Sequence, residues 1–181
     1  MPAPVILDLC GGSGSWSMPY REAGYDVRVV DPLVDGTDVR LMKHPGEPVH
    51  GILAAPPCEV FAVSGNRWQR SEQQVLDALS VVDACFRLVV VCRPRWWALE
   101  NPVGKLRRYL GVPTMIYDPC DFGDPWTKRT CLWGEFELPS PNPVEPTSVG
   151  YILNVSSSPE RAQIRAVTPP GFARAFFEAN P

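Results

Sequence analysis

A cysteine that directly follows two prolines is the first candidate for chemistry, within residues 55–66 (APPCEVFAVSGN). Prolines fix their own φ angles and push the preceding residue into extended geometry, so the backbone that carries Cys58 is expected to be stiff. A stiff backbone suits a thiolate nucleophile, which must be aimed at its target atom. A cysteine after a strand can instead be a small buried hydrophobic residue. Cys58 is therefore a candidate nucleophile, with core packing as the alternative.

A glycine-rich turn follows the first apolar run, at residues 8–14 (DLCGGSG). A turn of this kind between a strand and a helix lets backbone amides approach a nucleotide closely. The dinucleotide fingerprint requires a further glycine at position 17, where this chain has serine, so NAD binding is only weakly indicated. Asp31 ends the next expected strand, where a carboxylate can accept hydrogen bonds from both ribose hydroxyls. Together these features indicate S-adenosylmethionine, and the alternative is a plain tight turn.

A carboxylate closes a later apolar stretch, Glu100 in residues 98–102 (ALENP). In an open α/β sheet, ligands bind in the crevice beyond the carboxyl ends of the strands. If the strand ends meet at one edge, Glu100 and Cys58 both reach that crevice. A solvated glutamate before a turn is the alternative.

The elements that must position these residues alternate between strands and helices. This alternation predicts an α/β, Rossmann-like fold, as in S-adenosylmethionine-dependent methyltransferases, with a mostly parallel sheet and helices on both faces. Ser71 and Thr168 are the expected caps of the second and last helices. The apolar residues Val75, Leu76 and Leu79 are expected on the buried side of the second helix. Strands are expected at 4–9, 25–30, 50–54, 96–99, 114–117 and 130–133, and helices at 16–23, 71–89, 103–110 and 168–176.

Length, charge and cysteine usage limit the functional classes. A chain of 181 residues predicts one domain, 1–181, and a net charge of −3 disfavours nucleic-acid binding by bulk electrostatics. No apolar run approaches the ~20 residues that cross a bilayer, so no membrane association and a cytoplasmic location are expected. The six cysteines form no CxxC pair and the two histidines lie near none of them in sequence, so no metal site is expected.

Four motifs resemble the DNA cytosine-5 methyltransferase family, in order from about residue 5 to 134. DLCGGSGS resembles the family's first S-adenosylmethionine motif, with Cys10 where phenylalanine is usual. APPCEVFAVSGN is similar to its Pro-Pro-Cys catalytic loop, and ALENP to its Glu-Asn-Val motif with proline in place of valine. PCDFGDPWTKRTCLWG resembles a later Phe-Gly motif, in which Lys128 matches the first of two arginines and the second is lost. Residues 165–170 weakly resemble the ninth motif.

The resemblance implies a role for each candidate residue. It implies that the Cys58 thiolate adds to carbon 6 of cytosine, that Glu100 holds N3 and the exocyclic amine, and that Lys128 adds positive charge at the carbonyl. The cofactor would be S-adenosylmethionine, held by Asp8, Cys10, Gly11, Gly12, Gly14, Asp31, Pro32, Asp38 and Pro56. DNA, with the target base flipped out of the stack, would contact Ser64, Asn66, Arg67, Trp68, Arg70 and Arg129. Basic residues at 93–95 and 105–108 are interpreted as solvated charges.

The family's separate target-recognition domain, expected between the eighth and ninth motifs, has no room at that place in the sequence. In its place is an irregular loop rich in proline and serine, residues 135–159. The chain is therefore expected to be a minimal, phage-like cytosine-5 methyltransferase that modifies DNA in a short sequence context, in the host cytoplasm if phage-encoded. A protein partner that supplies recognition is a further expectation. The alternatives are methylation of a free cytosine nucleotide or RNA, and a non-catalytic S-adenosylmethionine-binding regulator.

Overall fold

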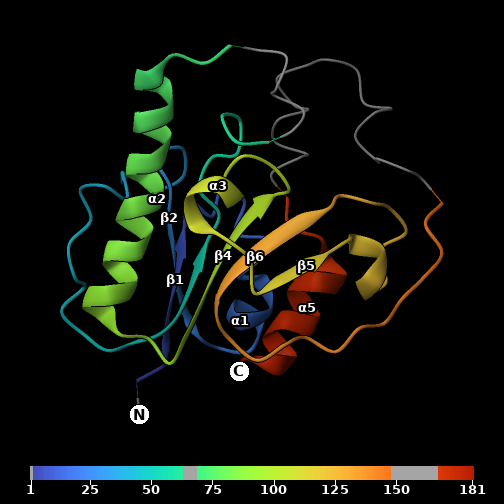
Figure 1. Ribbon diagram of the computed structural model, residues 1–181. Coiled ribbons are helices and arrows are strands. Elements are labelled where there is room, and N and C mark those ends of the chain that lie inside the picture. The colour runs from blue at the N-terminus through green and yellow to red at the C-terminus, as the bar shows by residue number, and fades with distance from the viewer. Residues whose placement is uncertain (1, 63–68, 148–166) are drawn as a thin grey trace.

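A computed structural model describes residues 2–62, 69–147 and 167–181 (Figure 1). These residues form a six-stranded sheet in the order β2-β1-β3-β4-β6-β5. The neighbours β1/β2, β1/β3 and β3/β4 pair in parallel, whereas β6 is antiparallel to both β4 and β5. The predicted mostly parallel sheet is confirmed. The strands are β1 (Val5–Leu9), β2 (Asp26–Val30), β3 (Val49–Ala54), β4 (Trp96–Pro102), β5 (Met115–Tyr117) and β6 (Thr130–Glu135).

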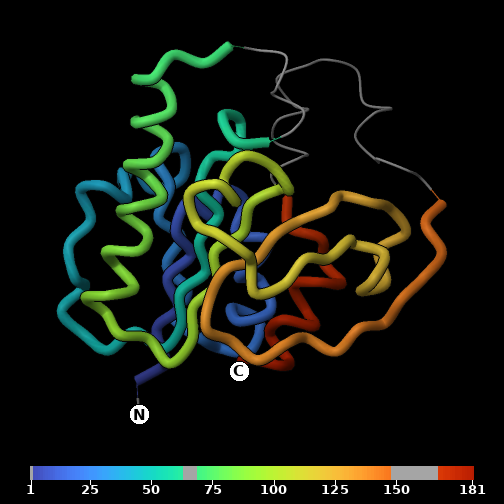
Figure 2. Tube along the Cα trace, viewed as in Figure 1, coloured from blue at the N-terminus to red at the C-terminus, as the bar shows by residue number. Residues whose placement is uncertain are grey.

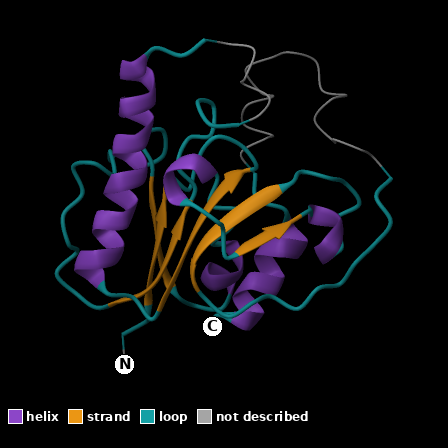
Figure 3. Cartoon of the chain, in the orientation of Figure 1, coloured by secondary structure: helices purple, strands orange, loops and turns teal. Residues whose placement is uncertain are grey.

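Helices cover both faces of the sheet, as expected (Figure 3). The long helix α2 packs on one face, and α1 and α5 pack together on the other. The helices are α1 (Met18–Glu22), α2 (Glu72–Cys92), α3 (Arg107–Leu110), the 3-10 helix η2 (Pro119–Phe122) and α5 (Pro170–Ala179). No helix in the described parts of the chain is long and apolar enough to span a bilayer.

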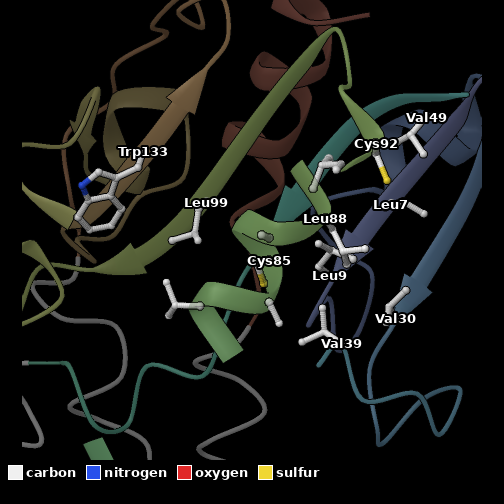
Figure 4. Packing of buried hydrophobic residues seen from close by; sticks show 14 of the residues in the cluster. Leu7, Leu9, Val30, Val39, Val49, Cys85, Leu88, Cys92, Leu99 and Trp133 are labelled. Atoms are coloured by element: carbon white, nitrogen blue, oxygen red, sulfur yellow. The ribbon is translucent and has the colours of Figure 1, made fainter. Parts of the chain in front are cut away.

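The core on the α2 face comes from the alternation of side chains along the strands. Leu7 and Leu9 of β1 join this cluster, whereas Ile6 between them joins the cluster on the opposite face. From the helix, Cys85 and Leu88 point toward β1 (Figure 4). Complete burial of a leucine side chain contributes roughly 1.5–3 kcal/mol, so these contacts hold α2 on the sheet.

The opposite face is an aromatic cluster that fixes the last helix. Phe172 and Phe176 of α5 are fully buried, and the Trp16 ring meets the Phe176 ring edge-on with centroids 5.5 Å apart. The Tyr20 hydroxyl donates a hydrogen bond of 2.8 Å to the carbonyl of Asn180. The predicted packing of the last helix against the sheet is confirmed.

The helix caps agree only partly with expectation. Ser71 caps α2, and its hydroxyl accepts a hydrogen bond from the Gln74 amide at 3.2 Å. Leu76, expected to be buried, is 59% exposed because the amino-terminal turns of α2 reach beyond the strand ends (Figure 1). Thr168 does not cap α5: Pro169 holds the cap position, and the Thr168 amide donates to Ser15 Oγ at 2.8 Å.

Two expected helices are shorter than predicted, and in the second of them tertiary hydrogen bonds engage the backbone of the first residues. Residues 103–106 lie outside α3: the Val103 amide donates to the Arg129 carbonyl at 3.0 Å, and the Lys105 amide to the Phe61 carbonyl at 2.7 Å. The expected helix at 16–23 is limited to Met18–Glu22, and η2 was not predicted. After β6, residues 135–147 run around the outside of the molecule and bond to η2 through Asn142 (Figure 2). The rest of the predicted 135–159 loop lies outside the described residues.

Candidate active site

The candidate residues meet at one edge of the sheet. Because β1, β3 and β4 are parallel neighbours, their carboxyl ends lie at the same edge, and the antiparallel β6 begins there. The glycine turn follows β1, the loop with Cys58 follows β3, Glu100 lies near the end of β4, and Lys128 lies two residues before β6. The fold thus brings together four motifs that are separate in the sequence.

The glycine turn presents bare backbone to solvent. Gly12 has a left-handed φ of 51°, and a Cβ built on it would meet no atom within 4 Å. Gly11, in contrast, lies where no side chain fits, because a Cβ there would lie 2.4 Å from the carboxyl carbon of Asp8. Cys10 also has a positive φ, 56°, which is uncommon for a residue other than glycine. This open, tightly turned backbone fits the close approach of a nucleotide-like cofactor.

Asp31 connects the end of β2 to this turn. One carboxylate oxygen accepts from the Gly12 amide at 3.1 Å and the other from the Leu33 amide at 2.9 Å. Each oxygen keeps a second lone pair, so the half-buried group can also accept from a ribose. Pro32, beside it, is exposed. The Asp38 carboxylate is bound by Arg40, whose guanidinium contacts both oxygens and lowers the pKa of Asp38. An adenine placed at Asp38 would therefore share the carboxylate with Arg40.

Asp8 is a fully buried carboxylate beneath the turn. Ser17 Oγ donates to its Oδ2 at 2.5 Å, and Oδ1 has no hydrogen-bond partner in the described parts of the chain. Burial raises the pKa of Asp8 to about 6, against the lowering effects of Ser17 and Arg21. A buried carboxylate with spare hydrogen-bonding capacity is a feature of a ligand site.

Ionisation of Asp8 should lower stability as the pH rises. The pKa of Asp8 in the folded protein, about 6, lies above the ordinary value of 3.8. Protonated Asp8 therefore contributes its full share of the folding stability below pH 3.8, and this share is lost as the pH rises through about 6. The change amounts to about 3 kcal/mol. We expect Asp8→Asn, which cannot ionise, to gain that much stability relative to wild type between pH 4 and 7. Urea unfolding at each pH measures it.

The matched control is Asp83→Asn, which removes an exposed carboxylate from α2. A stability difference between Asp8→Asn and wild type that stays constant from pH 4 to 7 would contradict the raised pKa of Asp8.

The loop with Cys58 is held by a buried asparagine. Asn101 Nδ2 donates to the Pro56 carbonyl at 2.9 Å, and the Asn101 side chain is fully buried. The Cys58 carbonyl accepts from the amides of Phe61 at 3.0 Å and Ala62 at 2.8 Å, which closes a tight turn. Cys58 itself is half-buried. This role of Asn101 was not predicted from the ALENP motif, although an asparagine next to a candidate catalytic glutamate was the available signal.

Glu100 lies in an environment that favours its protonated form. Burial raises the pKa of Glu100, and the positive charge of Lys128 opposes this effect. The buried Tyr117 lies near enough that Glu100 contributes, after burial, to raising the pKa of the Tyr117 hydroxyl. Tyr117 is a neighbour that the sequence did not reveal. A glutamic acid whose protonated form is favoured by burial is suited to donate a proton to a ring nitrogen.

Two of the residues predicted to bind nucleic acid are described. Arg70 is half-buried, and its Nη2 donates to the Glu59 carbonyl at 3.3 Å. Arg129 is exposed immediately before β6. Among the described residues, no cluster of three or more histidine, cysteine or acidic side chains could hold a metal ion. Ser64, Asn66, Arg67 and Trp68 lie outside the described residues.

Comparison with known proteins finds methyltransferases, although no family model matches the chain. The Type II methyltransferase M.DdeI of Desulfomicrobium norvegicum is 26% identical, over 68% of this chain and 38% of its own length. The Type II methyltransferase M.XorII of Xanthomonas oryzae pv. oryzae is 24% identical, over 88% of this chain and 49% of its own. The chain thus spans about half the length, or less, of these relatives.

A solved structure with a similar fold is also described as a methyltransferase. It is of a protein assigned as a DNA modification methyltransferase encoded within an E. coli prophage, with a TM-score of 0.57 and 17% identity. The match covers 86% of this chain and 56% of that protein. The relationship supports S-adenosylmethionine as the cofactor, which the open turn and Asp31 can accommodate. The chain is related in sequence to Type II DNA methyltransferases and has a methyltransferase fold, which confirms the resemblance of its motifs to those of DNA methyltransferases.

Proposed function

We propose that this chain methylates carbon 5 of cytosine in DNA through a covalent adduct with Cys58. The observation that carries the proposal is the hydrogen bond between Asn101 and Pro56, which joins the loop of the candidate nucleophile to the strand of the candidate acid. When bound, S-adenosylmethionine supplies an electrophilic methyl group. The described residues supply a nucleophile, an acid and a nearby positive charge at one sheet edge.

The reaction needs a nucleophile because carbon 5 of cytosine is itself a poor one. Addition of the Cys58 thiolate to carbon 6 forms a carbon–sulfur bond and places an electron pair at carbon 5, which takes the methyl group. Glu100, whose protonated form is favoured by burial, donates its proton to N3 as negative charge develops in the ring. Lys128 adds positive charge beside Glu100. Loss of the carbon 5 proton to solvent, elimination of the Cys58 thiolate and return of the N3 proton to Glu100 restore the aromatic ring and the acid.

The alternative acceptors in DNA are the exocyclic amines of adenine and cytosine. Direct transfer to an amine requires no covalent adduct and so no thiol. A cysteine on a loop constrained by two prolines, close in the fold to a carboxyl group with a raised pKa, therefore favours carbon 5 as the acceptor.

We also propose that sequence recognition is short. One bidentate contact with a base contributes roughly 1–3 kcal/mol of discrimination, so a site of several base pairs requires a large surface in a groove. The loop at 135–159 stands where the family resemblance places a recognition domain. A context of about two base pairs fits this surface, and longer recognition would require a partner protein.

Tritiated methyl transfer from S-adenosylmethionine to duplex DNA, single strands and dCMP in parallel tests the function. Nucleoside analysis should give 5-methylcytosine from the duplex, and bisulfite sequencing should give a short motif. A methylated amine would overturn the chemistry, and transfer to dCMP alone would make a free nucleotide the substrate. Bound S-adenosylmethionine without transfer to any substrate would indicate a regulator.

Asp31 provides a separate test of the cofactor site. Loss of a charged acceptor for two hydroxyls costs roughly 1.5–3 kcal/mol, so Asp31→Ala should bind S-adenosylmethionine about ten- to a hundredfold more weakly. Isothermal calorimetry measures this. Asp26→Ala, at the other end of β2, is the control. Equal affinities of the Asp31 variant and wild type would place the cofactor elsewhere.

A further inference from the structure

A positively charged pocket lies directly beside the loop that carries Cys58. Its volume is about 410 Å³, and it is bounded by that loop, the approach to α2 and the short helix α3. Phe61 and Tyr109 contribute aromatic walls, with their ring centroids 6.1 Å apart. Arg70, Lys105 and Arg108 also line it, and no carboxylate does so among the described residues.

The three cations have no acidic partners in the part of the chain that the structure describes. Arg28, Arg40 and Arg174 each pair with a carboxylate, whereas the pocket cations do not. The Nε atom of Arg70 is buried and has no acceptor within the described ranges. In a chain of net charge −3, such a group of uncompensated cations is a local site for an anion.

Backbone hydrogen bonds connect the pocket to the loop of the candidate nucleophile. The Lys105 amide bonds to the Phe61 carbonyl at 2.7 Å, and Ala62 and Gly104 form an antiparallel bridge. Gly104 permits this approach, because a Cβ there would lie 2.1 Å from the Phe61 carbonyl oxygen. Phe61 in turn belongs to the turn closed by the Cys58 carbonyl. An anion held by Lys105 is therefore held in a fixed relation to Cys58.

We propose that this pocket binds a phosphate group of the substrate, a backbone phosphate of the DNA whose cytosine reaches Cys58. The inference rests on the proposed function and names a contact that aligns the substrate. Guanidinium groups bind phosphate oxygens in a fork, and a lysine ammonium adds a point charge. A backbone phosphate contacted here fixes the register of the strand without reading its sequence.

The test compares Lys105→Gln and Arg108→Gln with wild type by fluorescence anisotropy on a duplex at several salt concentrations. Each substitution should lower the slope of log affinity against log salt by about 0.9, the value for one lost phosphate contact. We expect about tenfold weaker DNA binding, with a raised KM for DNA, because a charge-assisted bond is lost. S-adenosylmethionine affinity should not change.

The matched control is Arg107→Gln, because Arg107 is exposed on the same helix but does not line the pocket. Slopes that change equally at Arg107 and Arg108 would overturn the inference in favour of a diffuse basic surface. Wild-type methylation of DNA with unchanged slopes in both pocket variants would overturn it while the proposed function stands. Failure of wild type to bind or methylate DNA would overturn both.

A free nucleotide offers the same phosphate chemistry, so dCMP is the second arm. Competition by dCMP for the duplex, lost in Lys105→Gln, would support the pocket but assign it to the nucleotide's own phosphate. Absence of competition, together with the reduced salt slopes, would support the backbone phosphate.

Discussion

Cys58→Ala should show no detectable methyl transfer and should still bind S-adenosylmethionine with wild-type affinity. The substitution removes one heavy atom, the sulfur. That atom lies on a loop whose shape is set by two prolines and the Asn101 hydrogen bond, so the fold should persist. Without addition at carbon 6, carbon 5 cannot acquire the electron density that the methyl group requires. Scintillation counting of tritium in duplex DNA measures the loss, and Cys58→Ser should be inactive as well.

A trapping experiment tests whether Cys58 forms the covalent bond to the substrate or only lies near it. In a duplex with 5-fluorocytosine, fluorine replaces the proton that must leave carbon 5, so the wild-type protein should stay covalently attached and migrate more slowly on a denaturing gel. Cys58→Ala should form no such complex. Cys120→Ala, which removes another half-buried thiol, should trap normally. Appreciable transfer by Cys58→Ala would disprove the assignment.

The arrangement of strands and the grouping of motifs were predictable because they depend on local patterns. Buried runs such as Val5–Leu9, the glycine turn and the Ser71 cap each carry their own signal in sequence. Since parallel strands end at one edge, the placement of the Cys58 loop and Glu100 at the same edge followed from topology alone.

What could not be predicted depends on contacts between distant segments. Val103 and Lys105 were expected in a helix, but their amides bond to the carbonyls of Arg129 and Phe61, which no local pattern reveals. The side-chain bond from Asn101 to Pro56 spans 45 residues and depends on how β4 lies beside β3. The charged pocket has the same origin, because Arg70 and Lys105 become neighbours only when α3 docks on the Cys58 loop.

Glu100→Gln should lower the rate of methyl transfer by about 10²- to 10⁴-fold, the usual contribution of a positioned general acid. Glutamine preserves the shape of the side chain and its hydrogen-bonding capacity but cannot give a proton to N3. Affinity for S-adenosylmethionine should be unchanged, because the glycine turn and Asp31 belong to other strands. Glu135→Gln, at the far end of β6 and exposed, is the matched control.

The pH dependence then distinguishes an acid from a residue that only positions the base. Burial raises the pKa of Glu100, so its protonated form persists to higher pH than that of an exposed glutamate and is lost as the pH rises through the raised value. The wild-type single-turnover rate should therefore decline with this ionisation on the alkaline side. The residual rate of Glu100→Gln should lack that decline, because glutamine does not ionise. A variant with the wild-type pH profile and a merely scaled rate would show that Glu100 orients the cytosine and that the proton comes from another group.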